Sequence, residues 1–215
     1  LGAAVDGAMT AKMRNIGEAC TAANRFHVHT SVAGEFARRL ADRMGALRIG
    51  PGVEEDVQVG PLINAAAREK VGELVADAVG RGAKVLAGGE RMDGPGYFYR
   101  PTVLAGVPRD ARVVGEEVFG PVLSVIPVTS AEEAVAIAND SAYGLAGGVW
   151  TRSLDTAIKV VKGVRTGKMF VNSYNTAGID DMPHGGVKDS GTGREFGLAG
   201  LEEYQEQKTV QILLR

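Results

Sequence analysis

The first half of the chain alternates between strand-like and helical spacing of its apolar residues. Residues 25–32 alternate well enough to predict a strand, and residues 84–87 (KVLA) predict a short buried strand. Helices are predicted where apolar residues recur every three or four positions. These helical segments are residues 3–14, in which Gly7 is a weak position, residues 35–47, and residues 64–79, which Asn64 can cap.

The second half repeats the alternation. Strands are predicted at residues 100–104, 121–128, 147–151 and 168–172. Two helices are predicted between them: one from Ser130 to Ala138, with Glu133 completing a capping box, and one from Ser153 to Lys162. Strands that alternate with helices predict an α/β protein with a largely parallel sheet.

The segments after residue 171 are less regular. Residues 172–200 have little periodicity and many glycines, and such a long irregular segment is usually functional or disordered. Residues 207–214 (QKTVQILL) are strand-like, and no helix follows to cover them. We expect this strand to pair with another subunit or another domain.

Composition and charge exclude several classes of protein. The 215 residues, 45% of them hydrophobic, can bury a substantial core as one domain. The 24 basic and 26 acidic residues give a net charge of −2, so nucleic acid is not an expected partner. No apolar run or leader predicts a membrane partner. A single cysteine cannot form an internal disulfide, which favours a cytoplasmic location.

Cys20 is the first residue that could carry chemistry. It lies in NIGEAC (residues 15–20), a break between a predicted helix and a predicted strand. The residues alone leave two interpretations: a small buried side chain, which is commoner for a free cysteine, or a nucleophile. A nucleophilic thiolate needs a nearby positive charge, which Lys12 or Arg14 could supply, whereas Glu18 would oppose ionisation if it faced the sulfur.

Two further segments and the histidines have similarly open interpretations. EEVFGP (residues 116–121) is either a solvated turn or part of a ligand site, and the glycine-rich residues 182–195 are either a surface loop or a functional one. The glycine spacing within residues 182–195 does not fit a dinucleotide-binding loop. His27 and His29 share one face of a predicted strand without a third ligand, so no metal site is predicted.

Taken in order, three motifs resemble those of the aldehyde dehydrogenase superfamily. The family's Asn-x-Gly-Gln-x-Cys stands here as NIGEAC, with Glu18 in place of Gln. Its Glu-Glu-x-Phe-Gly-Pro stands as EEVFGP, and its Pro-Phe-Gly-Gly-x-Lys-x-Ser-Gly-x-Gly-Arg-Glu stands as PHGGVKDSGTGRE, with His184 in place of Phe. The resemblance covers essentially the whole chain and favours the nucleophile interpretation of Cys20.

The resemblance implies a fold and an activity. The fold would be the family's three-layer α/β sandwich, a catalytic domain over residues 1–200, followed by a C-terminal oligomerisation strand in residues 201–215 that forms a homodimer or homotetramer. Cys20 would attack an aldehyde to give a thiohemiacetal, and hydride transfer to NAD or NADP would leave a thioester for water to hydrolyse. The Cys20 backbone N–H would belong to the oxyanion hole.

The resemblance also implies roles for four further residues. Glu117 matches the acid that bonds the nicotinamide ribose, and Phe119 matches the aromatic residue beside the nicotinamide. Arg14 stands where enzymes resembling succinate-semialdehyde dehydrogenase bind the substrate carboxylate, which suits a planar guanidinium; a surface arginine is the alternative. His184 replaces an aromatic wall near the substrate. The expected substrate is therefore a small or acidic aldehyde, succinate semialdehyde among them.

Three parts of the family's machinery are not found in these residues: the general-base Glu, the oxyanion Asn and the dinucleotide-binding domain. The chain opens at Leu1 without an initiator Met, so we expect a piece of a longer polypeptide that folds but does not oxidise aldehydes by itself. Two alternatives stay open: a thiol esterase or hydrolase that uses Cys20, and a non-catalytic, self-associating fragment. The residues do not decide between NAD and NADP.

Overall fold

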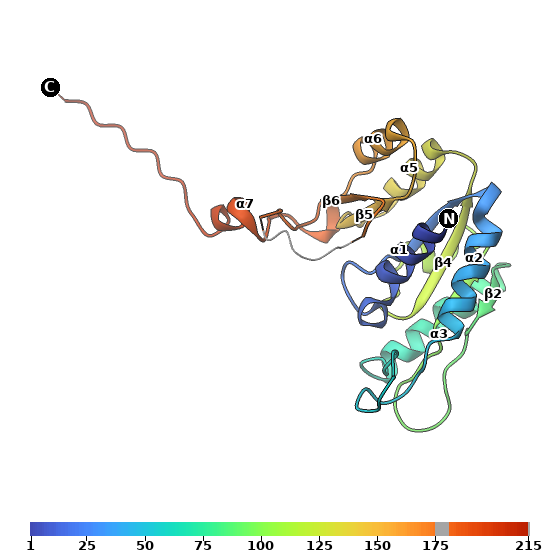
Figure 1. Ribbon diagram of the computed structural model, residues 1–215. Coiled ribbons are helices and arrows are strands. Elements are labelled where there is room, and N and C mark those ends of the chain that lie inside the picture. The colour runs from blue at the N-terminus through green and yellow to red at the C-terminus, as the bar shows by residue number, and fades with distance from the viewer. Residues whose placement is uncertain (175–180, 215) are drawn as a thin grey trace.

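The computed structural model describes residues 1–174 and 181–214, and its strands form two sheets (Figure 1). The larger sheet has the order β1-β4-β3-β2, in which β1 pairs with β4 and β4 with β3 in parallel, while β2 is antiparallel to β3. The smaller sheet is the parallel pair β5-β6. The strands are β1 (Arg25–His29), β2 (Lys84–Ala87), β3 (Thr102–Ala105), β4 (Val122–Val128), β5 (Ala146–Val149) and β6 (Lys168–Val171).

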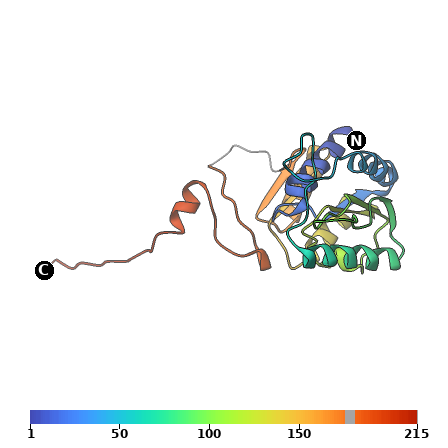
Figure 2. The ribbon, with the colours of Figure 1, turned by 90° about the horizontal axis from the view of Figure 1, so that it is seen from below.

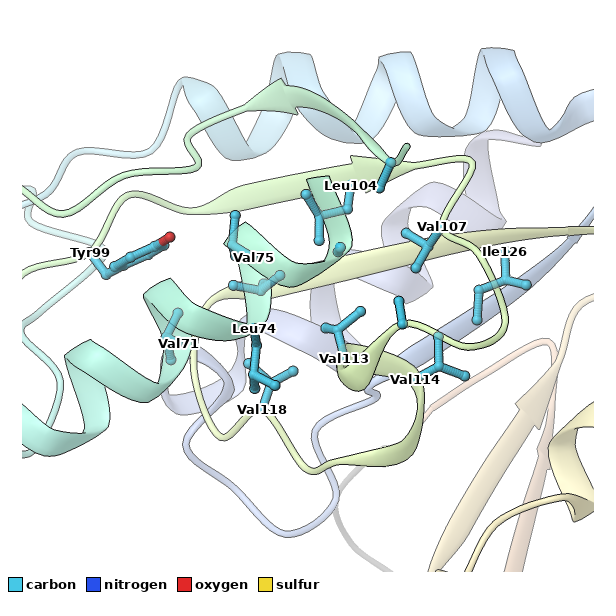
Figure 3. Packing of buried hydrophobic residues seen from close by; sticks show 14 of the residues in the cluster. Val71, Leu74, Val75, Tyr99, Leu104, Val107, Val113, Val114, Val118 and Ile126 are labelled. Atoms are coloured by element: carbon cyan, nitrogen blue, oxygen red, sulfur yellow. The ribbon is translucent and has the colours of Figure 1, made fainter. Parts of the chain in front are cut away.

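Helices cover both faces of the larger sheet, which gives three layers. Consecutive residues of β3 and β4 point to opposite faces, so each strand feeds two cores. Val103 and Val125 pack against α1 (Gly2–Met13) and α2 (Thr30–Gly45). On the other face, α3 (Ala65–Gly80) and α4 (Arg112–Gly115) close a second core with Leu104, Val122 and Ile126, which Figure 3 shows from close by.

The remaining helices lie along the second half of the chain. They are α5 (Ala131–Asn139), α6 (Leu154–Gly163), α7 (Gly197–Glu202) and the 3-10 turn η2 (Lys188–Ser190). A further 3-10 turn, η1 (Arg14–Gly17), directly follows α1 in the first half. The predicted α/β class with mostly parallel strands is confirmed. The pairing differs at β2, because the β2–β3 connection contains no crossover helix and the second strand can return antiparallel.

The predicted helix caps are confirmed at three positions. The side chains of Asn64, Ser130 and Ser153 each accept a hydrogen bond from the first turn of α3, α5 and α6 respectively, at 2.9–3.2 Å. The capping box at Glu133 is wrong in its partner, since this carboxylate accepts the N–H of Thr129 instead of that of Ser130. The Glu133 carboxylate thus stabilises the backbone at Thr129, the residue before the N-cap Ser130.

Two local predictions were wrong for tertiary reasons. The strand at residues 25–32 ends at His29, because the His29 imidazole accepts the Ser31 N–H and α2 begins at Thr30 instead of residue 35. Strand β2 is not buried: Val85 and Leu86 are 40% and 43% exposed at the edge of the sheet. Gly7 lies within α1, and the structure adds that it is a packing position, since a Cβ there would stand 2.1 Å from the Trp150 ring.

The strand-like tail lies outside the body of the protein. After α7 the chain runs extended away from the body, and residues 207–214 pair with no strand in the part of the chain that the structure describes (Figures 1 and 2). Its apolar side chains are exposed. The domain limits at residue 200 and the pairing of the tail with another chain stay predictions. No described helix has the length and hydropathy needed to cross a membrane.

Candidate active site

Cys20 lies at the exposed end of a strained turn. Between α1 and Cys20, three consecutive residues adopt left-handed backbone angles: Asn15 (φ 47°), Ile16 (φ 52°) and Gly17 (φ 85°). This conformation is costly for residues other than glycine. Asn15 stabilises the turn, since its side chain donates a 2.7 Å hydrogen bond to the Glu18 carbonyl and its own carbonyl accepts the Glu18 N–H at 2.9 Å. The strain is therefore concentrated in the motif that carries the thiol.

The carboxylate of Glu18, which replaces the family's Gln, is held by a neighbouring loop. Its Oε1 accepts the backbone N–H of Ile63 at 3.1 Å, just before α3. The backbone N–H of Cys20 makes no hydrogen bond within residues 1–174 and 181–214. That N–H remains available to an oxyanion.

The structure brings the first two motifs into contact through their glycines. A Cβ on Gly17 would stand only 2.2 Å from the Gly120 carbonyl oxygen, so the NIGEAC turn packs directly on the EEVFGP turn. Only a residue without a side chain permits this close approach at position 17. Next to Gly120 in the second turn, Phe119 has a φ of 50° and is 39% exposed.

The EEVFGP turn presents Glu117 to solvent because both of its neighbours are held. Asn24 donates to the Glu116 carbonyl at 2.8 Å and accepts the Val118 N–H at 3.3 Å. The Val118 side chain is buried in the core of Figure 3, and the Glu116 carboxylate pairs with Arg112 at 2.7 Å. Glu117 is exposed and makes no hydrogen bond or ion pair with the described residues.

Lys12 lies beneath these turns and is the most deeply buried cation of the site. Its side chain is 1% exposed, and its Nζ has no hydrogen-bond partner among the residues that the structure describes. Burial lowers the pKa of Lys12 to about 7, against the opposing attraction of the Glu117 carboxylate. The Lys12 ammonium, considered above as a partner for the thiolate, thus lies in the field of Glu117.

Tyr174 is a residue of the site that the sequence did not reveal. It follows β6, and its buried hydroxyl donates a 2.9 Å hydrogen bond to the carbonyl of Thr21, the residue after Cys20. Burial raises the pKa of Tyr174 to about 12, with the nearby Cys20 contributing. A polar aromatic residue directly after a predicted parallel strand was the available signal, because ligand sites gather at such strand ends.

Arg14 and His184 are not tied to this cluster by described contacts. Arg14 is exposed at the end of α1 and has no ion pair in residues 1–174 and 181–214. His184 exchanges two backbone hydrogen bonds with Glu195, and its Nδ1 lies 3.3 Å from the Lys168 Nζ on β6. The third motif is therefore anchored to the smaller sheet.

The fold and this site define an α/β protein in which a strained turn that carries an exposed thiol packs on an acidic turn, the two turns preceding the parallel strands β1 and β4. The chain belongs to the aldehyde dehydrogenase family, whose sequence model matches residues 1–210. It is 49% identical over 211 residues to succinate-semialdehyde dehydrogenase of Paenarthrobacter nicotinovorans, covering 97% of this chain and 46% of that protein. It is 41% identical to succinate-semialdehyde dehydrogenase [NADP(+)] 1 of Mycobacterium tuberculosis (strain ATCC 25618 / H37Rv), covering 99% and 46%.

Solved structures support the same membership. The chain superposes on succinate-semialdehyde dehydrogenase from Burkholderia pseudomallei with a TM-score of 0.91 and 40% identity, covering 94% of this chain and 42% of that one. The NAD+ complex of an aldehyde dehydrogenase from Bacillus cereus gives a TM-score of 0.94 and 37% identity, covering 100% and 43%. The chain thus spans less than half the length of these relatives.

Proposed function

We propose that this chain supplies the thiol and the ribose-binding acid of an NAD(P)-dependent aldehyde dehydrogenase. The observation that carries the proposal is the contact of Gly17 with Gly120, which joins the NIGEAC turn that carries the exposed Cys20 to the EEVFGP turn that carries Glu117. Family membership and relatives named as NADP(+)-dependent or crystallised with NAD+ support the same reaction.

The residues fit a nicotinamide cofactor at this edge. The exposed Glu117 carboxylate, which has no partner among the residues that the structure describes, can accept hydrogen bonds from the two ribose hydroxyls, and the half-exposed ring of Phe119 offers an apolar face two residues further on. Bound NAD or NADP would supply the hydride acceptor through which the aldehyde carbon is oxidised. Glu117 would orient that cofactor, and Phe119 would limit where it lies.

The chain's own part of the reaction begins at the Cys20 sulfur. As a thiolate it attacks the aldehyde carbon, forming a carbon–sulfur bond and a tetrahedral thiohemiacetal. The N–H of Cys20, which has no acceptor among the described residues, donates to the oxygen on which negative charge develops. After loss of hydride the sulfur carries a thioester, which water hydrolyses to the carboxylic acid and the free thiol.

Arg14 supports an aldehyde that carries a carboxylate as the substrate, with succinate semialdehyde as the specific proposal. Its exposed guanidinium, without an ion pair in the described chain, stands six residues before Cys20. Two relatives are named for succinate semialdehyde. His184 is proposed to line the same pocket from the third motif.

The exposed tail supports a proposal for assembly. Val210, Ile212 and Leu214 are all exposed on an extended segment outside the body (Figure 2). Burying such side chains and pairing the free backbone would stabilise association with another copy. We propose residues 1–200 as the catalytic domain and residues 201–215 as the segment that forms a homodimer or homotetramer.

The test of the reaction uses the native protein that contains these residues, with succinate semialdehyde and either cofactor. Cys20→Ala is expected to abolish formation of reduced cofactor while the far-UV circular dichroism is retained. Cys20→Ser, which keeps the size of the side chain, should do the same because a serine hydroxyl is not ionised at neutral pH. Substantial turnover in either variant would contradict the proposed nucleophile.

The role of the Glu117 carboxylate is tested by comparing the same substitution at Glu117 and at its neighbour Glu116. Glu117→Gln is expected to impair cofactor binding and hydride transfer by about tenfold or more through poorer positioning. Glu116→Gln, at a carboxylate already paired with Arg112, is the control. Equal effects would show that the turn, and not the Glu117 carboxylate, matters. Ester cleavage without cofactor, coupled to absent aldehyde oxidation, would favour the hydrolase alternative.

A further inference from the structure

We propose that Lys12 is a positioning residue whose enclosed ammonium supplies positive charge beneath the turn that carries Glu117, the acid proposed to bind the cofactor ribose. This inference rests on the proposed function, since it concerns the acid assigned there to the cofactor. It adds a residue that lies outside the three motifs and is enclosed within the protein.

The burial of Lys12 is unusual enough to require an explanation. Lysine is almost never fully buried unless it is paired, yet the Nζ of Lys12 is enclosed without a hydrogen-bond partner in residues 1–174 and 181–214. Its neighbours in the last turn of α1 do not require a charge, because α1 packs on an apolar core. An apolar side chain of similar length would avoid the cost of removing an ammonium from water.

The path of the side chain places its charge between the two motifs. The Lys12 Cε would lie 3.2 Å from a Cβ on Gly17, and the same Gly17 position abuts the Gly120 carbonyl. The side chain therefore runs beneath the junction of the NIGEAC and EEVFGP turns. Among the described residues, the charged group whose field acts on it is Glu117.

This arrangement gives the ammonium a function that stability does not. Once a cofactor covers Glu117, the carboxylate loses water, and its charged form then depends on a nearby positive charge. Lys12 supplies that charge from its enclosed position, while the exposed Glu117 carboxylate has no partner among the described residues and can accept the ribose hydroxyls. Because burial lowers the pKa of Lys12 to about 7, its charge is lost as the pH rises above neutrality.

The test compares three lysine variants of the native protein. Lys12→Met keeps the length and apolar stem without the charge, Lys12→Arg keeps a charge that does not titrate, and Lys84→Met changes an exposed lysine on β2 as the control. Measurements are the KM for NAD(P), kcat, binding of reduced cofactor by fluorescence, and the thermal midpoint, from about pH 6 to about pH 9, a range that spans the titration.

Lys12→Met is expected to raise the KM and the Kd for the cofactor by about tenfold at pH 6, with a smaller change in kcat. Its thermal midpoint should be unchanged or higher, because a buried ammonium has been removed. In the native protein, cofactor affinity should weaken as the pH rises through about 7. This weakening should be absent in both Lys12→Met and Lys12→Arg, because neither side chain titrates in this range. Lys84→Met should match the native protein.

A Lys12→Met variant with native cofactor affinity and a native pH profile would overturn the inference, and a lowered thermal midpoint in that variant would assign Lys12 to packing. The Cys20→Ala variant separates this failure from that of the proposed function. If Cys20→Ala loses turnover while retaining cofactor binding, the proposed function stands and the Lys12 result is decided alone. A native protein that binds no nicotinamide cofactor would overturn both.

Discussion

The side-chain amide of Asn24 donates a 2.8 Å hydrogen bond to the backbone carbonyl of Glu116, 92 residues further along the chain. The oxygen of the same amide accepts the Val118 N–H at 3.3 Å. The two bonds hold the peptide groups on either side of Glu117. The loop that follows Cys20 therefore sets the position of the acid proposed to bind the cofactor.

Replacing Asn24 with Ala is expected to raise the KM for the cofactor by about tenfold, because Glu117 would no longer be held at a fixed distance from the thiol. Loss of the two hydrogen bonds should also lower the free energy of unfolding by about 1–2 kcal/mol. Steady-state kinetics with varied cofactor and urea denaturation measure the two effects.

Asn139 offers a matched control for this variant. Its side chain makes the same two kinds of bond, to the Gly163 carbonyl and from the Arg165 N–H, each at 2.7 Å. Asn139→Ala should therefore lose similar stability and keep the native KM. If both variants raise the KM equally, Asn24 has a general structural role only.

The contact between the two motif turns predicts a large cost for a methyl group at Gly17. Gly17→Ala combines a left-handed φ of 85° with a clash on the Gly120 carbonyl, and should lower the free energy of unfolding by about 3 kcal/mol or more. Gly82→Ala has a φ of 105° but open space around the new methyl, and should cost about 1 kcal/mol. Equal losses would show that the turns do not pack as described.

Sequence patterns predicted those parts of the molecule in which local and tertiary preferences agree. The apolar stripe and the Asn64 cap placed a helix at residues 64–79, and α3 occupies Ala65–Gly80. The exposed edge at Val85 was not predictable, because spacing along one strand does not say whether a neighbour covers it. Gly7 looked unfavourable for a helix because glycine has a low helix propensity. Its packing against Trp150 was not predictable, because Trp150 is far away in sequence.

The candidate active site likewise has a part that the sequence predicted and a part that only the structure reveals. Motif resemblance pointed to Cys20 and Glu117, and the structure adds that their turns touch through Gly17 and Gly120. Asn24 and Lys12 were not assigned these roles, because an asparagine in a loop and a lysine in a helix have ordinary local explanations. Their roles depend on hydrogen bonds and burial created only when distant segments meet.

Arg14 should determine preference for a carboxylate-bearing aldehyde. Arg14→Ala is expected to raise the KM for succinate semialdehyde by about tenfold or more, since losing a charge-assisted hydrogen bond costs about 1.5–3 kcal/mol. An uncharged aldehyde of similar length should be affected much less. Arg38→Ala, on an exposed arginine already paired with Asp42 at 3.0 Å, is the control. Equal effects on both aldehydes would remove Arg14 from substrate recognition.

His27 predicts a specific loss of stability in acid. Its ring lies on β1 with Nδ1 buried and without a hydrogen-bond partner in the described chain. Burial, together with the positive charges of Arg25 and then Arg109, lowers the pKa of His27 from 6.5 to about 4. The folded protein therefore holds His27 neutral at pH values where the unfolded chain is already protonated.

The sign of the effect follows from this difference. Above pH 6.5 both states are neutral at His27, and the group contributes no pH dependence. As the pH falls from 6.5 to about 4, unfolding takes up a proton, so the free energy of unfolding decreases, by about 3 kcal/mol in total.

His27→Leu places an apolar side chain on the strand and removes the titration. Urea denaturation at stepped pH should show a constant difference between variant and native protein above pH 6.5, and a difference that shifts in favour of the variant below it. Parallel curves down to pH 4 would mean that His27 is solvated and protonated in the folded protein.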